Sequence, residues 1–146
     1  MAHWINYADR WLANRHSKNK TTGYKRGTIL FIDLGSCNFG HEPSFTHPAI
    51  VLAQTKDSIL IVPCSSKKYG KGFPDIIDAT PSDGFSSNTG IQTRSLRWIS
   101  KNRVISVIGK VTSSILDKID NKLLELIPLY SKQLSEKEQQ QRIISL

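Results

Sequence analysis

The sequence predicts a mainly β protein: a small antiparallel barrel with one added helix before it and another after it. Three patterns predict this fold. Residues 27–111 contain short β-branched runs separated by polar turns, residues 2–16 carry apolar side chains at helical spacing, and an apolar helix pattern follows residue 112. The chain has 146 residues, a length that suits one compact domain.

The N-terminal element is expected to be a short amphipathic helix. Its apolar face holds Trp4, Ile5, Ala8, Trp11 and Leu12. A polar linker follows, so residues 1–24 form a helical extension. The helix docks either on its own barrel or on a partner protein. We expect it to dock on its own barrel.

Six strands are expected in the barrel. Their predicted bounds are 28–34, 48–54, 58–63, 73–77, 90–98 and 103–110. Only residues 55–57 separate the second run from the third, so these two strands are predicted to form a hairpin.

A helix is predicted to follow the barrel. Thr112 begins it and Pro128 ends it. Its apolar face consists of Ile115, Leu116, Ile119, Leu123, Leu126 and Ile127. The residues after it contain a Glu- and Gln-rich stretch and are expected to form a helical tail with a frayed end. The predicted divisions of the chain are therefore 1–24, 25–127 and 128–146.

The positive charge of the chain lies in its first two segments. The formal net charge is +8, of which +5 falls in residues 1–26, +3 in residues 27–111 and none in residues 112–146. A basic front half favours a polyanionic partner. The alternative is that the charge only maintains solubility.

Cysteine content and hydropathy predict a reduced, cytoplasmic protein without a membrane segment. Cys37 and Cys64 lack the spacing of a metal site, and no motif for a cofactor is present. Two serines follow Cys64. Even so, we expect this residue to be a half-buried structural cysteine and not a thiol nucleophile.

Two short segments, residues 46–52 and 61–67, are the most informative for function. Each couples a β-branched run with small polar or ionisable side chains, which precede the strand in the first segment and follow it in the second. If the strands pair antiparallel, His47 comes to the same end of the sheet as Ser65 and Ser66. Lys67 lies beside them. A proton-transfer group, hydroxyl donors and fixed positive charge suit chemistry on a phosphodiester.

The order of these motifs resembles that of the MazF/PemK family of toxins from toxin–antitoxin pairs. The resemblance covers residues 25–127 and depends on six motifs in register: KRGTILFIDL at 25–34, Glu42, HPAIVL at 47–52, VPCSS at 62–66, LRWISKNRV at 96–104 and IGKV at 108–111. Membership implies an SH3-like barrel of the MazF and CcdB type, and a homodimer. It also implies a sequence-specific endoribonuclease that cuts single-stranded RNA without a metal ion, leaving a 2′,3′-cyclic phosphate and a free 5′-OH.

The resemblance assigns the catalytic positions to His47 and Ser65, where the family usually has an Arg and a Thr. Ser65 keeps a hydroxyl. His47 differs more, because Arg carries a permanent charge whereas His gains and loses a proton near neutral pH. Three interpretations stay open. His47 is the general base or acid while Lys67 or Arg97 stabilises charge, or the replacement weakens catalysis, or His47 is structural.

The matched motifs also assign RNA contacts to Glu42, Ser66 and Arg97. The pattern Lys67-Lys68-Tyr69-Gly70-Lys71 adds three lysines beside an aromatic ring, which suits phosphate contacts and base stacking. For Glu42 the alternative is a surface loop without a catalytic role, and for the lysines it is a solvated loop. A cognate antitoxin with an acidic tail is expected to cover the same groove.

A rival function exists for the same fold. A catalytically weak barrel would bind nucleic acid without cleaving it, or would bind a protein target, as the CcdB relatives bind DNA gyrase. The hydroxyl of Ser65 and the nearby lysines favour the enzyme, and the missing Arg favours the rival. Fold alone does not separate the two, because function depends on the site.

Overall fold

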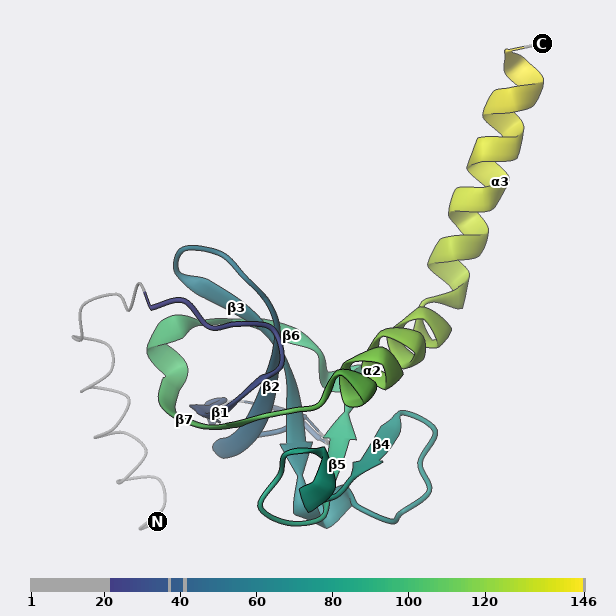
Figure 1. The fold of residues 1–146 in the computed structure, drawn as a ribbon. Coiled ribbons are helices and arrows are strands. Elements are labelled where there is room, and N and C mark those ends of the chain that lie inside the picture. The colour runs from purple at the N-terminus through teal and green to yellow at the C-terminus, as the bar shows by residue number, and fades with distance from the viewer. Residues whose placement is uncertain (1–21, 37, 41, 146) are drawn as a thin grey trace.

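The computed structural model describes residues 22–36, 38–40 and 42–145 (Figure 1). Its strands are β1 (Thr28–Asp33), β2 (Thr46–Gln54), β3 (Ser58–Ser65), β4 (Ile76–Ala79), β5 (Thr89–Gln92), β6 (Arg97–Ser100) and β7 (Val104–Lys110). Its 3-10 turns are η1 (Ser66–Lys68), η2 (Pro81–Asp83), η3 (Thr93–Ser95) and η4 (Lys101–Arg103), and its helices are α2 (Ser113–Leu126) and α3 (Pro128–Ile144). The helix predicted within residues 2–16 lies outside the described residues.

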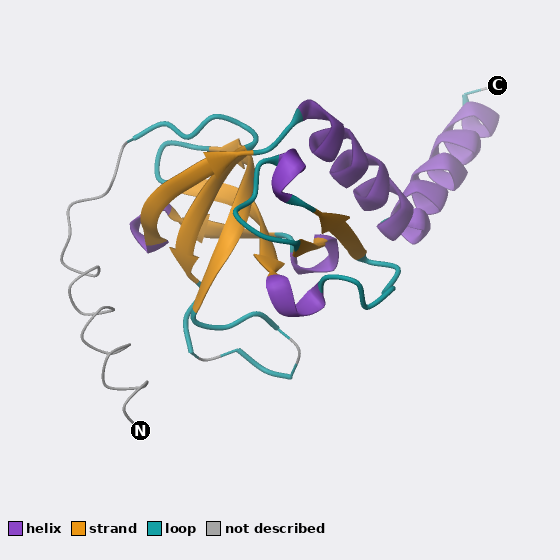
Figure 2. Ribbon diagram, turned by 60° about the horizontal axis from the view of Figure 1, so that its bottom comes forward, coloured by secondary structure: helices purple, strands orange, loops and turns teal. Residues whose placement is uncertain are grey.

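The strands form one antiparallel sheet in the order β4-β5-β3-β2-β1-β7, with β6 paired to β3. The prediction of a mainly β, antiparallel fold with a C-terminal helix is confirmed. The sheet curls strongly, as Figure 2 shows, but no strand pairing within the described residues joins β4 to β7. The predicted barrel is therefore an open one.

Strand β2 begins at Thr46 and β3 ends at Ser65, each two residues beyond its predicted bound, and two other predicted strands differ more. The run expected at 90–98 is divided into β5 and β6 by the turn η3. As a result, β5 pairs with the end of β3 and β6 pairs with its beginning. The strand expected at 73–77 begins at Ile76, because Pro74 has no amide hydrogen and the Ile76 amide closes a turn onto the Phe73 carbonyl at 3.1 Å.

Both faces of the central strands are buried, because alternate residues of β1, β2 and β3 point in opposite directions. One face, which includes Leu30 and Val51, is enclosed by the curl of the sheet together with side chains of β6 and β7. The other face, which includes Ile29 and Ile50, is covered by β4, β5 and α2. The two cores fix the strands, and therefore the positions of the polar side chains at the strand ends.

Helix α2 packs on the second face through Ile115 and Ile119, which are fully buried. Thr112 occupies the N-cap as predicted, but its side chain makes no capping bond, and its amide donates to the Asp83 carbonyl at 3.1 Å. Pro128 lies in the first turn of α3, where a missing amide hydrogen is tolerated. Helix α3 projects away from the sheet (Figure 1). Neither of the described helices has the length and apolar character needed to cross a membrane.

Candidate active site

His47 and Ser65 lie at matching ends of two paired strands. His47 is the second residue of β2, Ser65 is the last residue of β3, and Ala49 pairs with Pro63 between them. Continued by two residues, this antiparallel register brings His47 level with Ser65, and strand alternation turns both side chains to the same face. The predicted meeting of the two polar clusters at one end of the sheet is confirmed.

The chain turns sharply after Ser65 and presents two more polar side chains. Ser66 and Lys67 belong to the turn η1, which lies directly over Gly90 of β5. A Cβ on Gly90 would lie 2.8 Å from the carbonyl carbon of Lys68, so only glycine leaves room for the turn. Gly90 therefore allows Ser66 and Lys67, both exposed, to line the same pocket as His47.

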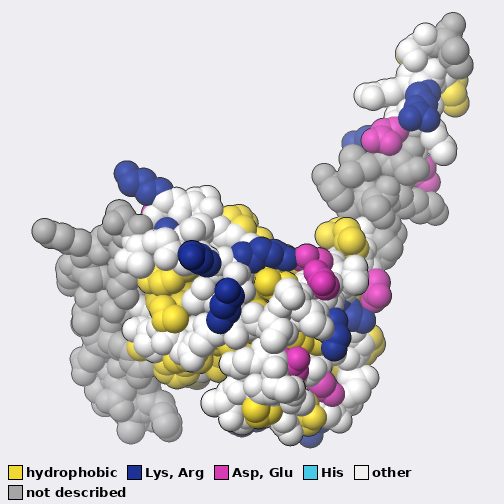
Figure 3. Space-filling model, viewed as in Figure 1, with side chains coloured by type: hydrophobic (Ala, Val, Ile, Leu, Met, Phe, Trp, Pro, Cys, Tyr) yellow, Lys and Arg dark blue, Asp and Glu magenta, His cyan; other side chains and the backbone are white. Residues whose placement is uncertain are grey.

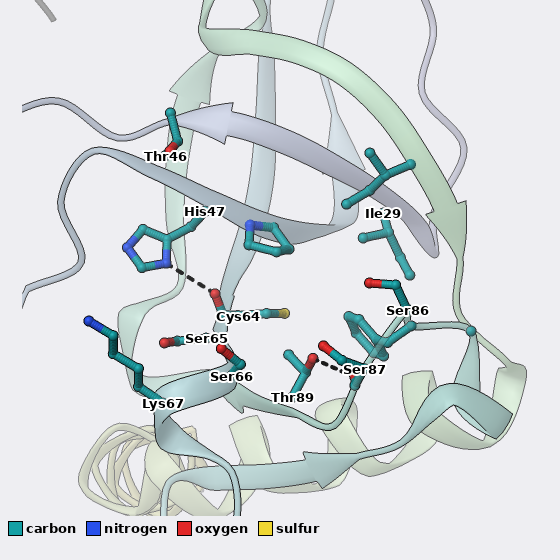
Figure 4. A pocket seen from close by; sticks show the side chains of 14 residues that line it. Ile29, Thr46, His47, Cys64, Ser65, Ser66, Lys67, Ser86, Ser87 and Thr89 are labelled. Atoms are coloured by element: carbon teal, nitrogen blue, oxygen red, sulfur yellow. Dashed lines mark hydrogen bonds between the residues drawn. The ribbon is translucent and has the colours of Figure 1, made fainter.

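A hydrogen bond orients the His47 ring. Its Nδ1 lies 3.1 Å from the carbonyl oxygen of Cys64 (Figure 4). A carbonyl oxygen only accepts, so Nδ1 donates and keeps its hydrogen whether the ring is neutral or charged. The nitrogen that exchanges a proton is then Nε2. In Figure 4 the His47, Ser65 and Lys67 side chains lie on the same side of the strands.

These side chains line a pocket of about 660 Å³ that has two halves of different character. The polar half consists of His47, Ser65, Ser66 and Lys67. The apolar half consists of Ile29, Pro48, Cys64, Phe85 and Ile108, and the hydroxyl side chains Ser86, Ser87 and Thr89 border it. In Figure 4, His47, Ser65 and Lys67 lie at the left of the view and Ile29, Ser86 and Ser87 at the right, with Cys64, Ser66 and Thr89 between them.

Cys64 contributes a thiol to the apolar half. The side chain is fully buried, and its Sγ lies 3.7 Å from the Val62 carbonyl oxygen. Burial raises the pKa of the Cys64 thiol far above its ordinary value. The thiolate is therefore suppressed at neutral pH. The prediction of a structural cysteine is confirmed, although the residue is completely buried and not half-buried.

Glu42 and Arg97 line a second pocket of about 540 Å³ and not the pocket of His47. The other lining residues are Asn38, Phe39, Pro43, Arg94, Ser95 and Leu96. The loop on this side is braced internally: the Glu42 carboxylate accepts from the Phe39 amide at 3.2 Å, and the Asn38 side chain donates to the Pro43 carbonyl at 2.8 Å. The structure thus divides the predicted site residues between two pockets.

Lys68 and Lys71 line neither of these pockets. The Lys68 Nζ lies 5.7 Å from the centroid of the Phe73 ring, a cation–π contact. Lys71 lies in an exposed loop between Gly70 and Gly72, which both have positive φ. On the face drawn in Figure 3, Lys and Arg side chains lie over the sheet and acidic side chains gather near α2. The described residues contain no cluster of three or more His, Cys, Asp or Glu side chains suited to holding a metal ion.

Comparison with known proteins decides the family. A family model described as the PemK-like, MazF-like toxin of type II toxin–antitoxin systems matches residues 25–127, which is most of the chain. The protein is a member of this toxin family. The resemblance found in the motifs is thereby confirmed.

The fold of this MazF-like toxin is similar to that of solved toxins. MazF from Deinococcus radiodurans matches with a TM-score of 0.61 and 19% identity, over 73% of this chain and 97% of that one. The MazE–MazF complex of the same organism gives 0.56 and 19%, over 71% and 95%. A mycobacterial endoribonuclease in complex with its cognate antitoxin gives 0.53 and 18%, over 69% and 91%. At these identities the likeness shows the fold. No curated protein sequence matches the toxin.

One wall of the toxin's pocket, the segment with Ser86 and Ser87, was not predicted from the sequence. In the sequence, these serines lie in a polar stretch between two predicted strands. A signal was present in Phe85, an isolated apolar residue that is 8% exposed and anchors the segment in the core. No pattern in the sequence indicates that Gly84 packs against the backbone of Lys110, which holds the wall in place.

Proposed function

We propose that this toxin is an endoribonuclease that cleaves single-stranded RNA sequence-specifically and needs no metal ion. One observation carries the proposal: a hydrogen bond to Cys64 leaves Nε2 of His47 free to exchange a proton in a pocket shared with Ser65 and Lys67. Membership of the toxin family supports the proposal, and two similar structures are described as endoribonucleases.

The reaction is an attack by a ribose 2′-OH on the adjacent phosphate. His47 Nε2 takes the proton of the 2′-OH, the 2′-oxygen bonds to phosphorus, and the bond from phosphorus to the 5′-oxygen breaks. The leaving 5′-oxygen takes a proton from water, so the products are a 2′,3′-cyclic phosphate and a 5′-OH. The Lys67 ammonium and the Ser65 hydroxyl stabilise the added negative charge. Lys67 is favoured over Arg97 for this role because it lines the pocket of His47.

The remaining predicted contacts serve RNA binding. Ser66 lies in the pocket beside the phosphate site, and Lys68 and Lys71 extend positive charge along the following loop. Glu42 and Arg97 line a separate pocket and bind a part of the RNA strand farther from the cleaved phosphate. Lys and Arg contacts to phosphate are sensitive to ionic strength, so RNA binding is expected to weaken as salt rises.

The first test is cleavage of a long RNA of defined sequence in the presence of EDTA, followed by mapping of the cut ends. We expect cleavage at a recurring short sequence with 5′-OH ends. The same reaction with added magnesium is the control and should run at a similar rate. Cleavage that EDTA abolishes, or products with 5′-phosphates, would contradict the proposed chemistry.

The second test replaces His47. His47→Ala should lower the cleavage rate by roughly 10²-fold or more, because it removes the proton acceptor. RNA affinity, measured by fluorescence anisotropy, should change little. Ser114→Ala on the exposed surface of α2 is the control. A fully active His47→Ala variant would make His47 a structural residue.

We also propose that a cognate antitoxin inhibits the toxin by covering the polar half of the pocket. Two of the similar structures are toxin–antitoxin complexes by description. The net charge of +3 in residues 27–111, with Lys67 in the pocket, suits an acidic tail that folds on binding. Attraction between opposite charges implies that association slows as salt rises. A hydrogen-exchange footprint that leaves His47 and Ser65 unprotected would contradict the shared site.

A homodimer is proposed through β7, an edge strand of the sheet. Ile105 and Val107 on this strand are both exposed, Val107 by 60%, and the strand carries no charge before Lys110. Figure 3 shows hydrophobic side chains exposed where β7 runs. Monomeric proteins protect such edges with charged residues or proline. Light scattering should report a dimer for the wild type and a monomer for Val107→Glu. A monomeric wild type would remove the proposal.

A further inference from the structure

We propose that the apolar half of the pocket binds the nucleobase next to the scissile phosphate, and that Ser86 and Ser87 determine which base is accepted. The proposal builds on the proposed RNA cleavage and names the specificity residues of that site. It concerns the half of the pocket that the catalytic chemistry does not use.

The composition of the two halves separates their tasks. His47, Ser65, Ser66 and Lys67 supply all the groups that the phosphate and the 2′-OH need. The other half is walled by apolar side chains, which neither hold nor react with a phosphate. A nucleobase has apolar faces and a polar edge, so it suits an apolar slot with hydrogen-bonding groups at its border. Because both halves belong to one pocket of about 660 Å³, a phosphate and an adjoining base can bind together.

The hydroxyls at the border are available for a ligand. Within the described part of the chain, the side chains of Ser86 and Ser87 have no hydrogen-bond partner, and both residues are exposed. Thr89 differs, because its hydroxyl donates to the Ser87 carbonyl at 2.9 Å (Figure 4) and the residue is only 5% exposed. Thr89 therefore supports the wall, and the two serines present a donor and acceptor pair toward the slot.

The wall is held rigidly, as discrimination between bases requires. Thr80 and Asp83 form a capping box at the start of the segment, with a 2.9 Å bond from the Thr80 amide to the Asp83 carboxylate. Gly84 packs against the Lys110 backbone, and the Phe85 ring is buried in the core. Ser86 and Ser87 are therefore held on both sides, by Gly84 and Phe85 before them and by Thr89 after them.

The test measures binding, so it does not depend on cleavage. The probes are four fluorescent 2′-O-methyl RNA hexamers, each of a single base, which lack the attacking 2′-OH. The wild type should prefer one base over the least favoured by at least about 10-fold in Kd, in keeping with the discrimination that good base contacts supply. In the double variant Ser86→Ala/Ser87→Ala, the Kd values of the four probes should lie within about 2-fold of one another. The Kd of the probe that the wild type binds most weakly should stay unchanged. Ser87→Thr keeps a hydroxyl and should keep more of the preference, and Ser114→Ala should not alter it.

The outcomes separate this proposal from the proposed cleavage. Loss of preference in the double variant supports the base site even if the wild type fails to cut RNA. An unchanged preference in the double variant, or a wild type without any preference, overturns the base site even if RNA is cut normally. If the double variant alters only the affinity for the antitoxin, the apolar half is a protein-docking groove and the proposal is wrong.

Discussion

Replacing Gly84 by alanine is expected to destabilise the toxin more than replacing a glycine in open space. Gly84 has a φ of +114°, in the left-handed region that side chains rarely adopt. A Cβ at this position would overlap the carbonyl oxygen of Lys110, which belongs to the end of β7. Gly72 is the matched control, because its φ is +73° and a Cβ added there would meet no atom within 4 Å.

The magnitude follows from the two contributions. Strain at a positive φ costs about 1–2 kcal/mol in either variant. In Gly84→Ala the overlap also pushes apart two backbone segments that the Thr112 amide joins at Asp83, and one such hydrogen bond contributes about 1 kcal/mol. The overlap also loosens the packing of the buried Phe85 side chain, and the destabilisation then includes part of the free energy of burying that side chain. The total is about 3 kcal/mol for Gly84→Ala, against about 1–2 kcal/mol for Gly72→Ala.

Equilibrium unfolding in urea measures both variants against the wild type. A loss of about 3 kcal/mol should also lower Tm by roughly 6–12 °C in a chain of this size. The comparison removes the strain that the two variants share, so the difference reports the contact with Lys110. If Gly84→Ala loses no more stability than Gly72→Ala, the wall of the pocket is not held against β7 and the reasoning is wrong.

Two further predictions concern buried positions near the pocket. In a Cys37→Ser background, iodoacetamide should label Cys64 only after unfolding. Burial raises the folded-state pKa of this thiol, so the unfolded chain ionises first as pH rises. The contribution of Cys64 to the free energy of unfolding is therefore complete below about pH 8.5 and declines above that value. In Cys64→Val the free energy of unfolding should decline less with pH, and an equal decline in the wild type and the variant would contradict this reasoning. Gly90→Ala should displace η1 and lower RNA cleavage by at least about 10-fold while circular dichroism stays native, because misplaced catalytic groups lose rate steeply. Normal cleavage by this variant would show that η1 is not positioned by Gly90.

The meeting of His47 with the serines at one end of the sheet was predictable, because the hairpin that brings them together is local. A three-residue connection fixes the hairpin, and the Thr55 amide closes it onto the Ser58 carbonyl at 2.8 Å. At the turn Gln54 pairs with Ile59, a register that would set His47 opposite Ser66. A register shift between Val51 and Ala53 brings His47 opposite Ser65 instead, and that shift was not predictable from the sequence. The same local information identified Cys64 as structural, since it continues a β-branched run.

The division of β5 from β6 and the wall at Ser86 were not predictable, because both depend on distant parts of the chain. The strand expected at 90–98 is divided because β5 pairs with the end of β3 and β6 pairs with its beginning. The composition of residues 90–98 does not show this division. The wall depends on contact between Gly84 and Lys110, and the approach of two backbone segments leaves no periodic pattern in the sequence.

The pairing of β3 also sets the order in which a growing chain acquires its site. β3 receives β2 from earlier in the chain, but its other edge stays open until β5 and β6 have been made, the last of which ends at Ser100. At synthesis rates of about 5–20 residues per second, the ribosome needs roughly 2–7 s to pass from Ser65 to Ser100. Until Gly90 has itself been made, part-way through that interval, η1 has no β5 to lie on. The toxin is therefore expected to become active late in its own translation, and a nascent chain that stops before β5 should lack a formed pocket.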